Sequence, residues 1–116
     1  MADHDHTYVA MLAAALEMAT EFRIPCPGHH YGHLADLRVT RRTDGHGNGW
    51  ALLNDDNHAW TGTRWLPQGV LAPSDIYRYD RQTALDEAQR IAPLVTAAFQ
   101  MQVQRIRSEY QEKTNG

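Results

Sequence analysis

The chain has 116 residues, of which 42% are hydrophobic and 22% charged, and its formal net charge is −3 at pH 7. This length suffices for one domain with its own hydrophobic core, so a scaffold that depends on disulfides or a structural metal is excluded. Cys26 is the only cysteine, so no disulfide can form within the chain. This cysteine usage favours a reducing compartment, and the expected location is the cytoplasm.

The sequence predicts neither a membrane-spanning nor a secretory segment. A membrane helix needs roughly 20 apolar residues, and the most apolar stretch, residues 8–18, is too short. Asp3 and Asp5 precede this stretch, where a secretory signal would carry basic residues. We therefore expect a soluble protein that forms a single domain over residues 1–116.

An amphipathic helix is predicted near the N-terminus. From Asp5 onward, apolar residues recur every three or four positions, at Tyr8, Leu12, Ala15, Leu16 and Ala19. Pro25 and Pro27 prevent a longer helix because proline lacks an amide donor and disfavours helical geometry in the preceding residue. We expect the helix to end near Arg23 and residues 24–33 to form a loop.

The middle of the chain is predicted to be an antiparallel meander. Leu37 and Val39 alternate with Arg38 and Thr40, which is typical of a half-buried strand. Further strands are expected at 50–54, 58–61 and 63–66, with a last possible strand at 76–79. The connections between them are too short for a parallel return, so successive strands must pair antiparallel.

A long C-terminal helix is predicted from Asp80, which is a favourable N-cap residue. Its apolar stripe consists of Leu85, Ala88, Ala92, Val95, Phe99, Val103, Ile106 and Tyr110. Pro93 interrupts this pattern and removes the hydrogen bond to the carbonyl of Gln89. The helix is therefore expected either to kink at this position or to divide into two helices that meet at Ala92.

These elements predict an α+β fold in which an N-terminal helix, three to five antiparallel strands and a long C-terminal helix pack with the helices on one sheet face. The expected core consists of Leu12, Leu16, Ala19, Leu37, Val39, Trp50, Leu52, Leu85, Ala88, Ile91, Val95 and Phe99.

Four potential metal ligands, Cys26, His29, His30 and His33, lie within eight residues. Thiolate and imidazole are ligands that zinc prefers, so a zinc site is one hypothesis for this segment. A structural zinc site normally takes its second pair of ligands from a distant segment, from which His58 or His46 could supply one ligand but not a complete pair. The other interpretation is a polar loop with a packed cysteine and no cofactor. No motif identifies a catalytic base, so the chain is predicted to be non-enzymatic.

A second hypothesis is a nucleic-acid-binding module. The predicted sheet is rich in tryptophan and arginine, and aromatic side chains on a sheet can stack on bases while arginines contact phosphates. The acidic balance of the chain and the need for large side chains in a small core disfavour this partner.

The favoured hypothesis is a protein–protein interaction module, expected as a homodimer with no further partner identified. A continuous helix from Asp80 to Gln111 would be about 48 Å long, whereas a domain of this size is about 26 Å across. The apolar stripe therefore continues beyond the core and predicts an interface at Phe99, Val103, Ile106 and Tyr110. The alternative is that the helix folds back at Pro93 and covers the first helix within a monomer.

Overall fold

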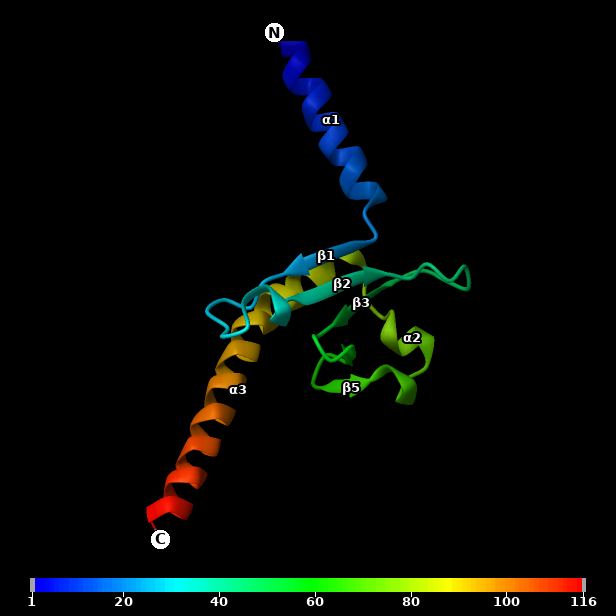
Figure 1. Cartoon of the computed structure of the whole chain (residues 1–116). Coiled ribbons are helices and arrows are strands. Elements are labelled where there is room, and N and C mark those ends of the chain that lie inside the picture. The colour runs from blue at the N-terminus through cyan, green and yellow to red at the C-terminus, as the bar shows by residue number, and fades with distance from the viewer. Residues whose placement is uncertain (1, 116) are drawn as a thin grey trace.

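The computed structural model describes the backbone of residues 2–115 and the side-chain surroundings of residues 7–15 and 17–113. A single sheet lies at the centre, and a helix projects from it at either end (Figure 1). This arrangement confirms the predicted α+β fold with an N-terminal helix, an antiparallel sheet and a long C-terminal helix on the sheet. No helix among the described residues is long and apolar enough to cross a membrane.

Five short strands form the sheet: β1 (Glu21–Ile24), β2 (Leu37–Arg41), β3 (Trp50–Leu53), β4 (His58–Trp60) and β5 (Trp65–Pro67). Their order in the sheet is their order in the chain, and every neighbouring pair is antiparallel. The predicted meander is therefore confirmed. Two short 3-10 helices, η1 (Gly32–Ala35) and η2 (Gln68–Val70), lie in the connections.

The first helix ends earlier than predicted. Helix α1 spans Ala2–Met18, and the next residues form β1 instead of a last helical turn. Phe22 and Ile24 alternate with two charged residues, and their Cα partners are Val39 and Leu37 of β2. This period of two places both apolar side chains on the buried face of the sheet, which a helical continuation could not do.

The predicted strand at 76–79 is also wrong. Ile76 ends a short helix, α2 (Pro73–Ile76), and of the segment that follows only Tyr79 forms a bridge, with Trp50. Gly49 makes this approach possible, because its φ is +120° and a Cβ there would collide with the carbonyl of Tyr77.

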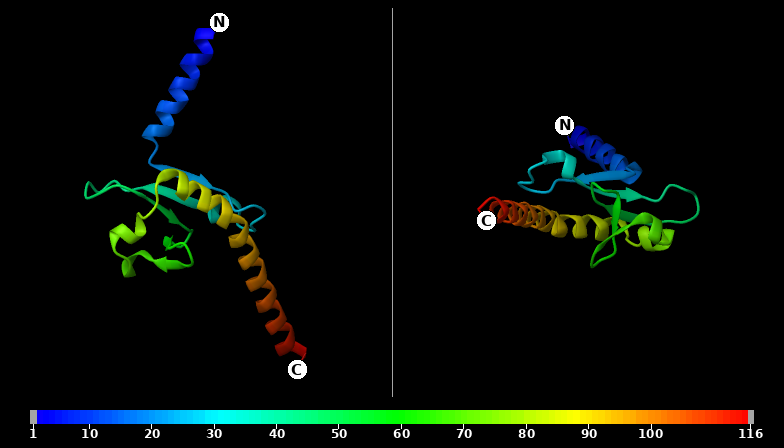
Figure 2. Two further views of the ribbon diagram at one scale, coloured as in Figure 1. Left: turned by 180° about the vertical axis from the view of Figure 1, so that it is seen from behind. Right: turned by 60° about the horizontal axis from the view of Figure 1, so that its bottom comes forward.

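Helix α3 (Arg81–Asn115) is a single unbroken helix that contains Pro93. The predicted cap is confirmed, since a carboxylate oxygen of Asp80 accepts the amide of Thr83 at 2.7 Å. The helix changes direction where it leaves the sheet (Figure 2), so the missing hydrogen bond at Pro93 bends the helix without dividing it. The alternative in which the chain folds back at Pro93 over the first helix is wrong.

The core lies between α3 and one face of the sheet. Of the predicted core residues, five are buried: Leu37, Val39, Leu52, Ala88 and Ile91. Trp50, Leu85 and Val95 pack half-buried against them. Four buried residues that are absent from the predicted core complete the cluster: Cys26, Trp60, Ala84 and Ala92. The opposite face is covered in part by α2, where Ile76 packs with Ala51, Leu53 and Ala59.

The prediction that both helices cover one face is wrong for α1. Every described side chain of α1 is exposed, and Leu12, a predicted core residue, is 49% exposed. Ala19 is half-buried but belongs to no core cluster, and the side chain of Leu16 lies outside the described residues. The radius of gyration is 18.8 Å, against about 13 Å for a compact domain of this size.

Candidate interaction surface

Helix α3 has a proximal half that belongs to the core and a distal half that does not. Its side chains are buried at Ala84, Ala88, Ile91, Ala92 and Thr96. No described residue of α3 beyond Thr96 is fully buried. Residues 100–115, which we call the distal segment, continue away from the sheet (Figure 1).

Phe99 marks the boundary between the two halves. Its ring centroid lies 4.5 Å from that of His29 and 5.3 Å from that of Tyr31, and the ring of His30 stacks at 6.5 Å. The loop between β1 and β2 therefore covers Phe99, which is half-buried. Phe99, one of the four predicted interface residues, therefore already packs against residues of its own chain.

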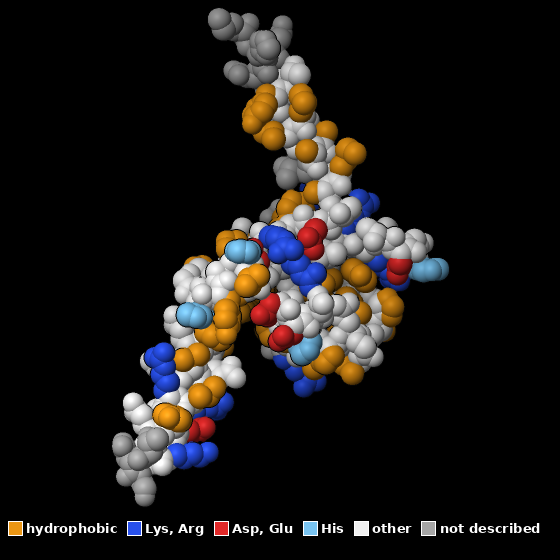
Figure 3. All heavy atoms as spheres, in the orientation of Figure 1, with side chains coloured by type: hydrophobic (Ala, Val, Ile, Leu, Met, Phe, Trp, Pro, Cys, Tyr) orange, Lys and Arg blue, Asp and Glu red, His pale blue; other side chains and the backbone are white. Residues whose placement is uncertain are grey.

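The other three predicted interface residues lie on the distal segment. Ile106 is 56% exposed, Tyr110 is 68% exposed, and Val103 is half-buried. A hollow of about 330 Å³ lies beside Val103, between Tyr31, Phe99 and Arg107. Apolar side chains are visible along the distal segment and along α1, and basic side chains are visible near the end of α3 (Figure 3). The stripe is therefore outside the core of the described chain.

A second apolar patch on α3 was missed by the sequence analysis. Leu94 is 55% exposed and Met101 is 71% exposed. At 100° per residue they face away from the Val103–Ile106 stripe. The sequence does indicate this patch, because apolar residues recur at 94, 98 and 101. This repeat is weaker than the predicted apolar stripe of α3, so it was overlooked.

The four predicted metal ligands do not come together. Among the described residues, no group of three or more His, Cys, Asp or Glu side chains is placed to hold a metal ion. Cys26 is buried, and its thiol donates a hydrogen bond to the carbonyl of Ala35 at 3.2 Å. Burial raises the pKa of this thiol, and the nearby Asp36 and Asp55 raise it further. The protonated thiol is a poor metal ligand and a poor nucleophile.

The histidines of this loop have other surroundings. Nδ1 of His29 accepts the amide of Tyr31 at 3.1 Å, and His33 is exposed on η1. The aromatic contacts of His29 and His30 with Phe99 hold the loop against α3. Zinc binding stays a prediction that the geometry of this loop does not favour.

The tryptophans are in the core instead of on an open sheet face. Trp60 is buried, and Trp50 and Trp65 pack against the same core cluster. The indole nitrogen of Trp60 donates to Glu87 at 3.0 Å. Arg38, on the opposite face, forms an ion pair with Glu21 at 3.9 Å. Base stacking by these tryptophans therefore has no support in their placement.

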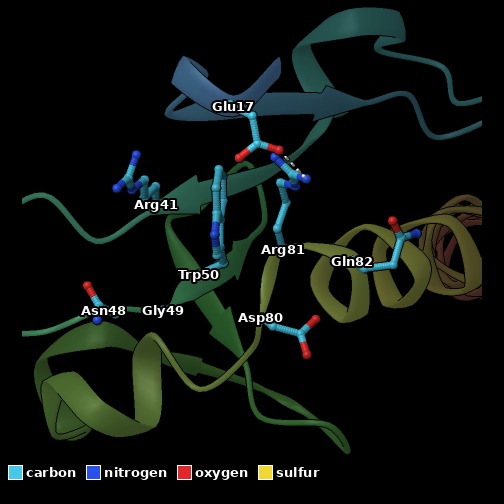
Figure 4. Close-up of a pocket in the computed structure, with 8 residues that line it drawn as sticks. All are labelled: Glu17, Arg41, Asn48, Gly49, Trp50, Asp80, Arg81 and Gln82. Carbon is cyan, nitrogen blue, oxygen red and sulfur yellow. Dashed lines mark hydrogen bonds and ion pairs between the residues drawn. The ribbon is translucent and has the colours of Figure 1, made fainter. Parts of the chain in front are cut away.

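The base of α1 is held at the start of α3. Glu17 forms an ion pair with Arg81 at 3.2 Å, above the ring of Trp50 (Figure 4). These residues line an open hollow of about 540 Å³ together with Arg41 and Asp80. Hydrogen bonding to Thr83 lowers the pKa of the Asp80 carboxyl, so Asp80 stays charged as the helix cap at neutral pH. Two acidic and two basic side chains line this hollow, which therefore carries no dominant charge for a ligand.

The distal segment of α3 is thus the strongest candidate functional surface. Comparison with known proteins finds no matching family model, no similar curated protein and no similar solved structure.

Proposed function

We propose that this chain is a non-enzymatic interaction protein that self-associates, as a homodimer, through the apolar stripe of the distal segment. One observation carries this proposal: the core ends near Thr96, whereas the apolar stripe continues along α3 through Val103 and Ile106. Exposed apolar surface at regular helical spacing is typical of an interface.

The stability of the distal segment supports the same conclusion. It has about four helical turns outside the core, and isolated helices of this length are marginally stable in water. Contact with a partner would stabilise the helix, because it would remove the apolar stripe from water. A two-fold pairing of identical chains is the commonest way in which such a surface is covered.

Sedimentation equilibrium of the wild type and of Ile106→Asp tests the proposal. We expect the wild type to associate at tens of micromolar and Ile106→Asp to associate at least about tenfold more weakly, because a buried unpaired carboxylate opposes the contact by at least about 1.4 kcal/mol. Thermal melting of the dilute variant should match that of the dilute wild type, since Ile106 is largely exposed within one chain.

Met101→Asp is the matched control, because it introduces the same charge on the opposite side of the same helix. It should associate like the wild type. A wild type that stays monomeric over the whole concentration range would refute the proposal, as would an Ile106→Asp variant that associates normally.

A further inference from the structure

If the chain self-associates as proposed above, the distal segment of one copy is covered by a particular part of the other copy. The described side chains of helix α1, at residues 7–15, 17 and 18, are exposed, and Tyr8 and Leu12 are 65% and 49% exposed. Its stripe of Tyr8, Leu12 and Ala15 has spacings of four and three residues. The stripe of Val103, Ile106 and Tyr110 has spacings of three and four. Both helices therefore present matching seams.

Helix α1 cannot cover the distal segment of its own chain. The ion pair between Glu17 and Arg81 places the base of α1 at the start of α3. Tyr8 lies only about 14 Å from Glu17 along α1, whereas Ile106 lies about 37 Å from Arg81 along α3. In addition, the two helices leave the sheet at opposite ends (Figure 1). A partner helix for the distal segment must come from another molecule.

A two-fold rotation between two copies supplies that helix. It exchanges the two ends of the molecule, so α1 of one copy lies along the distal segment of the other, and reciprocally. The lengths agree, since α1 is about 25 Å long and the distal segment about 24 Å. Helix α1 runs toward its sheet and α3 runs away from its sheet, so the two helices of each pair are antiparallel.

This length match selects a register in which the two seams coincide. With Met18 beside residue 100, Ala15 lies opposite Val103, Leu12 opposite Ile106, and Tyr8 opposite Tyr110. An apolar residue therefore meets an apolar residue at each seam position, as knobs-into-holes packing requires.

The charges of the two helices are also complementary. Helix α1 has three acidic residues and no lysine or arginine, whereas the distal segment contains Arg105, Arg107 and Lys113 beside two glutamates. Antiparallel packing further places the positive N-terminal end of the α1 dipole beside the negative C-terminal end of α3. We propose that the homodimer forms by reciprocal exchange of α1, each copy packing its α1 on the distal segment of the other.

Complementation of two variants tests this exchange by sedimentation equilibrium. Leu12→Asp damages α1, and Ile106→Asp damages the distal segment. We expect each variant alone to associate at least about tenfold more weakly than the wild type. An equimolar mixture should recover association, because a mixed dimer contains one pair of helices with both seams intact. Ala10→Asp and Met101→Asp, on the opposite sides of the two helices, should associate like the wild type.

The outcomes separate this inference from the proposed function. If Leu12→Asp associates normally while Ile106→Asp does not, or if the mixture fails to recover association, the exchange is refuted and self-association through α3 stands. A monomeric wild type refutes both.

Disulfide cross-linking is a second readout, which does not depend on whether the Asp variants fold normally. In a Cys26→Ser background, Ala15→Cys with Val103→Cys should form a disulfide-linked dimer under oxidation, and Ala10→Cys with Val103→Cys should not. Equal yields of the two linked dimers would also refute the exchange.

Discussion

At the scale of single residues, Glu87 connects α3 to the tryptophan that closes the core. Its carboxylate accepts the indole N–H of Trp60 at 3.0 Å and two hydrogen bonds from Arg90 at 2.9 Å. The hydrogen bonds from Arg90 lower the pKa of Glu87, and the bond from Trp60 lowers it further against the opposing effect of burial. The charged form of Glu87 therefore stabilises the fold.

This network predicts a specific pH dependence. Because the pKa of Glu87 is lower in the folded than in the unfolded chain, its contribution is present above the unfolded value, about 4.3, and is lost as the pH falls through the folded value. Glu87→Gln should lower the free energy of unfolding by about 1 kcal/mol at pH 7 and have almost no effect near pH 2. Urea denaturation at several pH values measures this difference.

Glu112→Gln is the control, because it removes the same charge from an exposed site near the end of α3. Its stability should follow that of the wild type across the pH range. A constant difference between Glu87→Gln and the wild type from pH 7 to pH 2 would contradict the proposed role of the charge.

At the scale of elements, the two halves of α3 have different surroundings. Its proximal half follows the sheet, and its distal half leaves it after the bend at Pro93 (Figure 2). Pro93 is exposed, while its neighbour Ala92 is buried. The proline therefore faces away from the sheet and gives up one backbone hydrogen bond without disturbing the core.

Pro93→Ala should restore that hydrogen bond and raise the free energy of unfolding by about 1–3 kcal/mol, because proline in a helix interior is about 3 kcal/mol less favourable than alanine. Chemical denaturation monitored by circular dichroism measures the change. An unchanged or lower stability would show that the packing of α3 on the sheet requires the bend and is strained by a straight helix.

At the scale of the whole molecule, the elongated shape follows from unequal lengths. The longest extent of the chain is 72 Å and the shortest is 18 Å. The longest strand has five residues, about 17 Å, whereas α3 is about 52 Å long. The sheet is too short to cover the whole helix, so the remainder must find a partner or remain in water.

The exchange of α1 predicts that its backbone amides become protected only on association. Hydrogen exchange should be fast in α1 for dilute protein and should slow as the concentration rises, while exchange in β2 should not change. Leu12→Asp should remove the concentration dependence. Protection of α1 that is the same at every concentration would contradict the exchange.

Local sequence patterns predicted much of the fold. The alternation in residues 37–40 predicted β2, and short polar turns required antiparallel pairing. Asp80 located the start of α3. Each of these features depends on residues that are neighbours in the chain, so the sequence alone was sufficient to place them. The same patterns predicted the stripe at Val103 and Ile106.

Other features depended on contacts between distant residues. Residues 21–24 could continue a helix or form a strand, and they form a strand because they pair with Leu37 and Val39. The periodicity of α1 resembles that of a core helix, yet the sheet face is filled by α3. Periodicity identifies an apolar surface but does not identify what covers it, because that depends on the area each element offers after folding. For this reason only the tertiary structure could separate the core half of α3 from its distal segment.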